Sequence, residues 1–524
     1  MPTPSPRASR RALLAGAAAA GGAAVLPLAT AGPAHADDLL LSTDFSSGTT
    51  EGWYPRGAVA LSVNAEGNLL VEGRTATWNG PAIDITAHLE VGVRYQLRVL
   101  LRLPSGTDAA DLRTTVQRDA AGSTAYETVR WNTAVTPDAW TEFTGTYSIT
   151  QPADLLQFYV ESDSSLTPVL VDDFTLTRIQ EPEIQDLLPL KDFLECDFPI
   201  GCAVEPPEVV GKPAELLAKH FAQVTTGNQM KPDAIQPTEG VFTFERADQI
   251  VAFAEANGMR IWGHTLLWHN QTPAWWFLDA AGNPLQPTRA HRALLLARFE
   301  AHVTALAEHY GDRVWAWDVV NEVVDPEQAD GLRRSRWYEV FGGGAYIGEV
   351  FKIARRVLPR KVKLFINDYN TEFPDKREAL YNLVQDLKRG RVPVDGVGHQ
   401  AHVDYKRDPQ LLGESIDAFR RLRVLQAVTE LDVSVSDYME ESLPSTPPER
   451  LAAQGRYYQE LFAVLRARAR HLESVTMWGL YDAVSWLRTW PVSRPHEAPL
   501  FFDDRLQAKA AYWGVVDPAQ LPPE

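Results

Sequence analysis

The stretch Val314-Trp315-Ala316-Trp317-Asp318-Val319-Val320-Asn321-Glu322 is an apolar run that ends in an amide and a carboxylic acid. Such a run is typical of a strand buried on both faces of a parallel sheet, with polar groups at its carboxyl end. Runs of this kind occur at 198–204, 221–226, 260–267, 314–320, 362–366, 396–401, 425–429 and 475–480. Amphipathic helical segments alternate with them, among them 213–220, 247–257, 289–309, 376–388 and 449–470.

Eight strand–helix units fill about 320 residues from residue 196 onward. This arithmetic predicts an α/β fold, a (β/α)₈ TIM barrel. An open doubly wound sheet is disfavoured because no GxGxxG turn follows any of the strands.

The chain ahead of the barrel has a different pattern. From about residue 39 to 178, short alternating runs are separated by turn residues and show no helical periodicity: 58–63, 68–72, 95–103, 114–118, 141–148, 155–161 and 169–177. Many short strands at this spacing predict an antiparallel β-sandwich, resembling a jelly roll. We place the sandwich at 37–178, a linker at 179–189 and the barrel at 190–519.

Residues 1–36 read as an export signal. They contain three Arg and no acid, then an Ala/Gly/Leu-rich run that ends in Ala34-His35-Ala36, small residues at the positions a signal peptidase reads. Arg10-Arg11 after Ser9, followed by Leu13-Leu14, resembles a twin-arginine signal. We therefore expect a secreted, extracellular protein; a cytosolic protein with a disordered start is the alternative.

Composition narrows the function further. The formal net charge of the 524 residues is −18, which argues against nucleic acid or an anionic membrane as the main partner. Two Cys cannot form a disulfide framework, and no Cys/His spacing indicates a zinc site. A Cys196–Cys202 disulfide would need the chain to bend back within six residues, so a buried free Cys202 is favoured. The 15 Trp offer flat faces that suit neutral sugars.

Polar side chains follow strand after strand in the predicted barrel. A barrel brings the carboxyl ends of its strands to one rim, where the chemistry of this fold lies. Taken singly, a Glu after a strand is more often a solvated loop residue, and a His or Trp more often belongs to the core. Together, two Glu with His, amides and Trp predict a cleft for glycosidic bond cleavage, which needs two carboxyl groups and no metal.

Several motifs carry a family resemblance. Trp317-Asp318-Val319-Val320-Asn321-Glu322, Thr429-Glu430-Leu431-Asp432, Gly263-His264-Thr265-Leu266-Leu267-Trp268-His269 and Asn367-Asp368-Tyr369-Asn370 closely resemble glycoside hydrolase family 10, the endo-β-1,4-xylanases. Asn228-Gln229-Met230-Lys231, Gln400-Ala401-His402 and Trp478-Gly479 match further family segments in the same order. The resemblance covers about 190–516 and implies hydrolysis of xylan with retention of configuration.

The resemblance also implies roles for individual residues. Glu430 is the expected nucleophile and Glu322 the general acid, later the general base. His402 and Asp432 are expected to orient Glu430, and Asn321 to reach the hydroxyl beside the reacting carbon. The sugar subsites are expected to include Asn228, Lys231, His264, Trp268, Tyr369, Gln400, Trp478 and Trp486.

Gly227 departs from the family pattern, which usually has an acidic residue immediately before the Asn-x-Met-Lys segment. In the family this residue contacts the sugar one step beyond the cleavage point, on the non-reducing side. We therefore expect weaker binding there, and lower Michaelis constants on short xylo-oligosaccharides after Gly227→Glu.

The sandwich resembles carbohydrate-binding module family 22 over about 42–176. The resemblance rests on Gly52-Trp53-Tyr54-Pro55-Arg56, Trp78-Asn79-Gly80-Pro81, Tyr126-Glu127-Thr128-Val129 and Tyr159-Val160-Glu161. It implies a xylan-binding groove formed by Arg56, Trp78, Tyr126, Tyr159 and Glu161, with core packing as the alternative for Trp78 and Tyr159. Trp53 and Trp140 are expected in the core. Asp44 and Asp172 are candidates for a structural Ca²⁺ site of the kind that such modules often carry, because hard carboxylate ligands suit calcium.

The favoured interpretation is an endo-β-1,4-xylanase, a monomer, with xylan and xylo-oligosaccharides as partners and no cofactor in catalysis. A related retaining barrel acting on β-glucan or mannan is the second hypothesis, because it would share the two Glu. A non-catalytic sugar-binding barrel is the third.

Overall fold

The computed structural model describes residues 38–437, 439–440 and 443–523. The predicted export signal, residues 1–36, lies outside the described residues.

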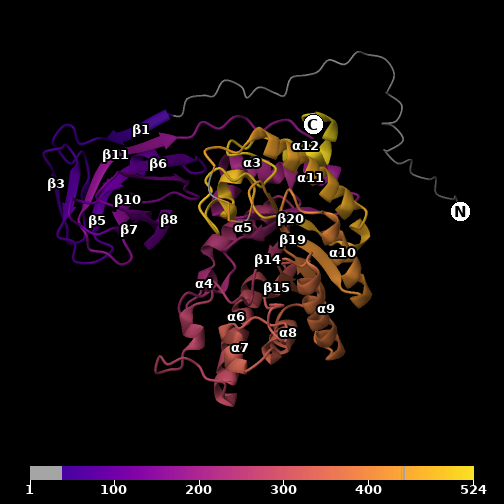
Figure 1. Ribbon diagram of the computed structural model, residues 1–524. Helices are drawn as coiled ribbons and strands as arrows, with labels where there is room; N and C mark the ends of the chain where they lie inside the picture. Colours follow the sequence, from indigo (N-terminus) through magenta and orange to yellow (C-terminus); the bar gives the residue numbers. More distant parts are fainter. Residues whose placement is uncertain (1–37, 438, 441–442, 524) are drawn as a thin grey trace, which may run out of the picture. The chain divides into compact units, whose positions relative to one another are not determined.

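Eight parallel strands form a closed ring. They are β12 (Ile200–Val204), β13 (Gln223–Thr226), β14 (Arg260–Gly263), β15 (Ala316–Asn321), β16 (Lys363–Asp368), β17 (Gly396–His399), β19 (Leu425–Ser434) and β20 (Val475–Met477). Figure 1 labels four of them, β14, β15, β19 and β20. Each of the eight pairs in parallel with its neighbour, and the pairings of β17 with β19 and of β20 with β12 close the sheet on itself. The predicted (β/α)₈ barrel is confirmed.

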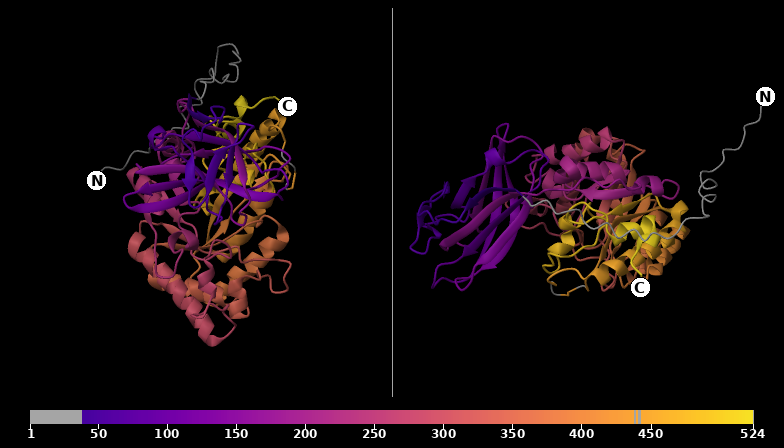
Figure 2. Two further views of the ribbon diagram at one scale, coloured as in Figure 1. Left: turned by 90° about the vertical axis from the view of Figure 1, so that its left-hand side faces the viewer. Right: turned by 90° about the horizontal axis from the view of Figure 1, so that it is seen from above.

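Helices surround these strands, as the two further views also show (Figure 2). The longer ones are α3 (Gly211–His220), α5 (Glu245–Ala256), α6 (Arg289–Tyr310), α8 (Ala345–Val357), α9 (Pro374–Arg389), α10 (Gln410–Phe419) and α11 (Pro448–Arg466). Shorter helices are α2 (Leu190–Phe193), α4 (Pro232–Ile235), α7 (Arg336–Phe341) and α12 (Ala510–Val516). In α8, Tyr346, Ile347, Val350 and Phe351 are buried, a spacing that places one apolar face against the strands.

Two strand ends differ from the sequence-based expectation by four residues or more, and both differences affect the site. The third strand ends at Gly263, four residues earlier than predicted, so His264 follows the strand. The seventh runs to Ser434, five residues beyond the predicted end, because the short strand β18 (His402–Asp404) pairs with its outer half. Glu430 and Asp432 are therefore held within a paired strand.

The N-terminal region is an antiparallel module of two sheets. One has the order β3-β4-β11-β6-β9, with β1 paired to β11, and the other β2-β5-β10-β7-β8. Their bounds are β1 (Asp38–Thr43), β2 (Tyr54–Arg56), β3 (Ala60–Val63), β4 (Leu69–Glu72), β5 (Gly80–Asp84), β6 (Tyr95–Arg102), β7 (Ala110–Ala120), β8 (Ser123–Val135), β9 (Thr141–Tyr147), β10 (Leu155–Glu161) and β11 (Val169–Arg178).

The sequence missed β1, β2, β5 and β8 in this module. β2 and β5 contain Pro, and β8 is rich in polar and exposed residues, so these strands lack the apolar alternation that predicts a strand. The core between the sheets includes Trp53, as predicted, with its indole edge-on to Phe158 and Phe174. Trp140 is only half-buried, against Arg102, so its placement in the core was wrong.

The segment between β11 and α2 has no regular structure but is tied to the barrel by hydrogen bonds. Lys219 donates to the carbonyl oxygen of Gln185 at 2.7 Å, and the Tyr512 hydroxyl donates to that of Leu188 at 2.7 Å. Among the described residues, no helix has the length and apolar character needed to cross a membrane.

Candidate active site

One cleft of about 810 Å³ receives side chains from the ends of all eight barrel strands. Every barrel residue that the sequence predicted for catalysis or sugar binding lines it: Asn228, Lys231, His264, Trp268, Asn321, Glu322, Tyr369, Gln400, His402, Glu430, Asp432, Trp478 and Trp486. The parallel register of the strands explains this convergence, because it brings every carboxyl end to the same rim.

Glu430 is a buried carboxylate within β19. One oxygen accepts a hydrogen bond from Asn367 Nδ2 at 2.6 Å, and the other lies 3.2 Å from His402 Nε2. Burial acts to raise the pKa of Glu430, but the His402 hydrogen bond, the charges of His264 and His402, and the Asn367 hydrogen bond outweigh burial and lower it. The site therefore favours the ionised form of Glu430.

His402 owes its charge to two carboxylates. Its Nδ1 lies 2.9 Å from Asp432 Oδ2, which also accepts a hydrogen bond from the Trp486 indole at 2.8 Å. Burial acts to lower the pKa of His402, but Asp432 and Glu430 together raise it to about 10. A protonated His402 donates to both carboxylates and fixes the position of Glu430.

Glu322 has the opposite electrostatic setting. It follows β15 directly, with a backbone φ of 57°, a left-handed conformation that is uncommon for a residue with a side chain. Burial raises its pKa, and the charges of Asp368 and Glu430 act in the same direction. The cleft therefore holds two carboxyl groups whose pKa values are shifted apart.

A chain of hydrogen bonds connects these two carboxyl groups. Gln400 Nε2 donates to Glu322 Oε1 and to Asn321 Oδ1, both at 3.2 Å. Asn367 Nδ2 donates to Asn321 Oδ1 at 3.0 Å as well as to Glu430. Because Asn321 accepts twice through its oxygen, its amide NH₂ is the group left to donate to a ligand.

A second polar network lies on the loops after β13 and β14. Lys231 Nζ donates to Asn228 Oδ1 at 2.9 Å and to Gln271 Oε1 at 2.8 Å, and lies 4.7 Å from the centre of the Trp268 ring. Burial lowers the pKa of Lys231. Asn228 Nδ2 in turn donates to Glu205 Oε1 at 2.6 Å, and Glu205 also lines the cleft.

The space beside Gly227 is smaller than the sequence-based expectation assumed. A Cβ atom at Gly227 would lie 2.6 Å from Glu205 Oε1, so any side chain there must displace Glu205. The prediction that Gly227→Glu would lower Michaelis constants therefore meets a steric and a like-charge obstacle. The binding strength at this subsite stays a prediction.

Indole and imidazole rings surround the buried carboxylates. His264 Nδ1 lies 2.9 Å from Asp318 Oδ2, and its ring lies edge-on to that of Trp478 at 5.3 Å. The Trp486 ring packs against His402 at 4.9 Å.

Sequence reasoning missed three cleft residues that form hydrogen bonds with the predicted ones. They are Glu205, Gln271 and Arg333. Arg333 donates to the backbone carbonyl of Glu322 and to the Tyr369 hydroxyl, each at 2.7 Å. Glu205 directly follows the first apolar run, so the strand-end rule would have found it; the other two lie in loops with no periodic signal.

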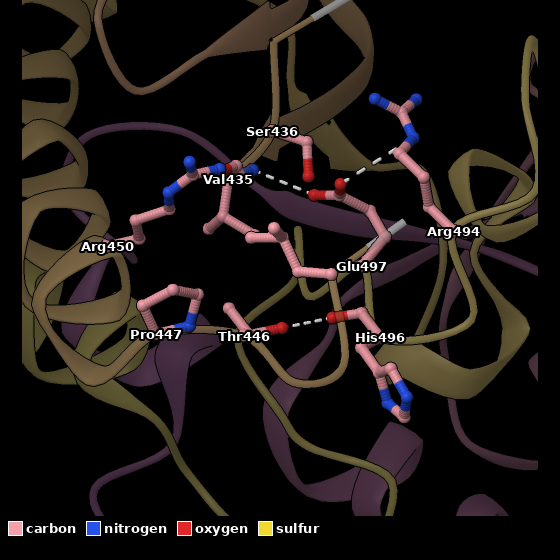
Figure 3. A pocket seen from close by; sticks show the side chains of 9 residues that line it. Val435, Ser436, Thr446, Pro447, Arg450, Arg494, His496 and Glu497 are labelled. Carbon is pink, nitrogen blue, oxygen red and sulfur yellow. Dashed lines mark hydrogen bonds and ion pairs between the residues drawn. The ribbon is translucent and has the colours of Figure 1, made fainter. Parts of the chain in front are cut away.

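A much smaller pocket lies past the end of β19 (Figure 3). Its volume of about 10 Å³ has room for about one water molecule, so it is too small for a sugar. Figure 3 shows Glu497 at its wall, where the carboxylate accepts a hydrogen bond from the Val435 backbone at 2.7 Å and pairs with Arg494 at 3.9 Å. Arg494 also donates to the backbone carbonyl of Trp490, a residue that lines the main cleft, at 3.4 Å.

In the module, Arg56 gathers three of the predicted aromatic residues. Its guanidinium carbon lies 3.8 Å from the centre of the Tyr159 ring, 5.2 Å from Trp78 and 5.6 Å from Tyr126. Tyr159 is buried, whereas Trp78 and Tyr126 are exposed. The rings open to a ligand are therefore Trp78 and Tyr126.

The fifth predicted module residue, Glu161, is buried. It pairs with Arg113 at 2.9 Å and accepts a hydrogen bond from the Thr115 hydroxyl at 2.8 Å. Trp131, on the same strand as Tyr126, is also exposed, although the sequence analysis did not single it out.

The two carboxylates of the expected calcium site accept hydrogen bonds within the module. Asp44 accepts hydrogen bonds from Ser46, and Asp172 from Asn68 at 3.2 Å. Within 38–437, 439–440 and 443–523, no three His, Cys, Asp or Glu side chains are grouped so as to hold a metal ion. Calcium at Asp44 and Asp172 stays a prediction. Cys202 is buried and Cys196 exposed, and both are free.

Known protein families match both regions of the chain. The sequence model described as "Glycosyl hydrolase family 10" matches residues 189–518, and the one described as "Carbohydrate binding domain" matches residues 37–166. The chain is 37% identical over 525 residues to "Exoglucanase XynX" of Acetivibrio thermocellus, covering 94% of this chain and 46% of that protein. It is 36% identical over 517 residues to "Endo-1,4-beta-xylanase A" of Thermoanaerobacterium saccharolyticum, covering 94% and 43%.

The chain thus spans less than half the length of these two relatives. Among solved structures, xylanase B from Clostridium stercorarium F9 is 42% identical with a TM-score of 0.62, over 63% of this chain and 100% of that chain. The family model covers well over half of the sequence and coincides with the barrel and its cleft. The chain therefore belongs to glycosyl hydrolase family 10, with a carbohydrate-binding domain ahead of its barrel.

Proposed function

We propose that this protein is an endo-β-1,4-xylanase that hydrolyses internal bonds of xylan with retention of anomeric configuration. One observation carries the proposal: Glu430 and Glu322 share a cleft, and their surroundings lower the pKa of the first and raise that of the second. Double displacement needs such a pair, one carboxylate to attack and one carboxylic acid to protonate. The relatives' names support xylan as the polymer.

In the first step, Glu322 gives its proton to the oxygen of the leaving sugar while Glu430 attacks the anomeric carbon. The bond from that carbon to the leaving oxygen breaks, and a bond to a Glu430 oxygen forms. The Asn321 NH₂ donates to the hydroxyl on the neighbouring carbon, an interaction that strengthens as positive charge develops on the ring. His402 holds Glu430 in line during the attack.

In the second step, Glu322 acts as a base. Formation of the ester removes the negative charge of Glu430. The repulsion that helps to raise the pKa of Glu322 is therefore reduced. Glu322 takes a proton from water, and the resulting hydroxide oxygen attacks the anomeric carbon and releases Glu430 as a carboxylate. All these groups come from one chain, and the chemistry uses no metal or organic cofactor.

We also propose that the module binds the same class of polymer and that the protein is secreted. The exposed rings of Trp78 and Tyr126 support the first proposal. The Arg-containing, acid-free start of the sequence and its Ala34-His35-Ala36 ending support the second.

The test is the release of reducing sugars from xylan, mixed-linkage glucan and mannan by the wild type and by Glu430→Ala. We expect release from xylan by the wild type alone, with products that NMR first detects as the β-anomer. Products first detected as the α-anomer would contradict retention. No release from any polymer by a folded protein that still binds xylan would indicate a non-catalytic sugar-binding barrel.

A β-glucanase is the second candidate, because one relative is named an exoglucanase. A rate on mixed-linkage glucan equal to or above that on xylan would favour it.

A further inference from the structure

Glu205 is a carboxylate of the cleft to which the proposed mechanism gives no role. It directly follows β12, and its two oxygens accept one hydrogen bond each, from Asn228 Nδ2 and from Gln229 Nε2, both at 2.6 Å. Gln229 is itself held by Arg246, which donates to its Oε1 at 3.1 Å. The Glu205 carboxylate is therefore fixed in position before any ligand binds.

The backbone beside Glu205 is shaped to admit this carboxylate. Gly227 leaves the space that Glu205 Oε1 fills, since a Cβ atom there would lie 2.6 Å from that oxygen, closer than real Cβ contacts. The Gly227 amide is itself fixed by a hydrogen bond to the carbonyl of Val204 at 3.1 Å. Gly227 and Glu205 are thus a matched pair, in which the absence of one side chain gives room to the other.

The carboxylate has spare hydrogen-bonding capacity. Each carboxylate oxygen can accept two hydrogen bonds, and the amides use one on each. Sugar hydroxyls are the donors that a neutral polysaccharide brings to a cleft. Lys231 and Asn228, which share the network, line the same part of the cleft.

We propose that Glu205 binds a hydroxyl of the sugar one step beyond the cleavage point, on the non-reducing side, and so determines how strongly that sugar is held. This inference rests on the proposed function. It replaces the expectation that no carboxylate serves this subsite because Gly227 has no side chain. Glu205 supplies the carboxylate from the neighbouring strand end.

The neighbouring Glu208 helps this part of the cleft to hold a single negative charge, on Glu205. The Glu208 carboxyl accepts a hydrogen bond from the Glu205 backbone amide at 2.7 Å. Burial raises the pKa of Glu208 to about 8, with the Glu205 charge acting in the same direction. At neutral pH Glu208 is therefore mostly protonated. Burial also raises the pKa of Glu205, but the hydrogen bonds from Gln229 and Asn228 and the charges of Lys231 and Arg246 act against burial, which favours Glu205 as the carboxylate of the pair.

The experiment compares two substrates with the same aryl leaving group, a β-xyloside with one sugar before the bond and a β-xylobioside with two. We expect Glu205→Gln to lower kcat/KM on the xylobioside by about 10- to 100-fold, mainly through KM, because a hydrogen bond to a charged acceptor is lost. The xyloside does not reach Glu205 and should change by less than twofold, which also shows that the variant folds. Glu195→Gln, at an exposed carboxylate ahead of β12, is the matched control and should leave both substrates unchanged.

A pair of variants tests the match between Gly227 and Glu205. Gly227→Glu alone should raise KM on the xylobioside, since two carboxylates then compete for one space. Glu205→Ala combined with Gly227→Glu should be more active on this substrate than Glu205→Ala alone.

The two proposals fail in different ways. No cleavage of either substrate or of xylan by the wild type would overturn the proposed function and this inference together. Cleavage by the wild type, with Glu205→Gln equally impaired on both substrates or on neither, would overturn this inference alone.

Discussion

The barrel cleft and the aromatic surface of the module place their functional side chains at opposite extremes of exposure. Glu430 is 4% exposed and Trp78 is 50% exposed. In the cleft, burial and neighbouring charges shift pKa values, and Glu322 and Glu430 each accept hydrogen bonds from neighbouring side chains. Around Arg56, two rings face solvent. Proton transfer needs shifted pKa values and hence burial, whereas stacking on a long polymer needs open rings.

The largest effect is expected from removing the nucleophile of the cleft. Glu430→Ala should lower kcat on xylan by about 10⁴-fold or more, because no covalent intermediate can form. Azide added to this variant should restore turnover and give a glycosyl azide of inverted configuration, since a small anion fits the vacated space. The product is identified by NMR.

Glu322→Ala is the control for this experiment. On an aryl glycoside with a good leaving group, bond cleavage needs little proton donation, so formation of the intermediate should be much less impaired than on xylan. Equal losses on both substrates would contradict the role of Glu322 as general acid.

A smaller effect should follow from removing the charge behind His402. Asp432 raises the pKa of His402, so Asp432→Asn lowers it, and a neutral His402 no longer stabilises ionised Glu430. The pKa of Glu430 then rises. The acid limb of the pH profile of kcat/KM should therefore move to higher pH, by about one unit or more.

The control for this variant is Asp437→Asn, at an exposed carboxylate that pairs with Lys406. Its pH profile should match that of the wild type. An acid limb that stays in place in Asp432→Asn would show that His402 does not set the charge of Glu430.

The smallest effect concerns the module. Trp78→Ala should weaken retention on insoluble xylan by about 2- to 10-fold, the contribution of one aromatic contact, and leave kcat/KM on soluble xylotetraose unchanged. Trp131→Ala removes another exposed ring, on the strand that carries Tyr126. If Trp131→Ala weakens retention as much as Trp78→Ala does, the binding surface extends beyond the predicted residues to Trp131.

The barrel was predictable because its apolar runs recur at regular intervals and each ends in a polar group. Glu430 and Asp432 were placed at the right strand end, although the strand that holds them continues to Ser434. That extension depends on pairing with β18, a contact between distant parts of the chain that periodicity does not reveal.

The contact between Glu205 and Gly227 was equally hidden from the sequence. It joins the ends of two strands. The lack of a side chain at Gly227 can be interpreted only once the position of the Glu205 side chain is known. In the module, core packing was offered as the alternative for both Trp78 and Tyr159. The structure exposes Trp78 and buries Tyr159 against Arg56.

The hydrogen-bonded chain from Glu322 through Gln400, Asn321 and Asn367 to Glu430 has a consequence for how this site can evolve. Residues in one such network show coupling energies of about 0.5–3 kcal/mol, so the effect of replacing one depends on which others are present. The three amides are therefore epistatic. A change at any one of them alone costs activity at both carboxyl groups, and mutational routes to a new specificity must either leave these three unchanged or replace them as a set.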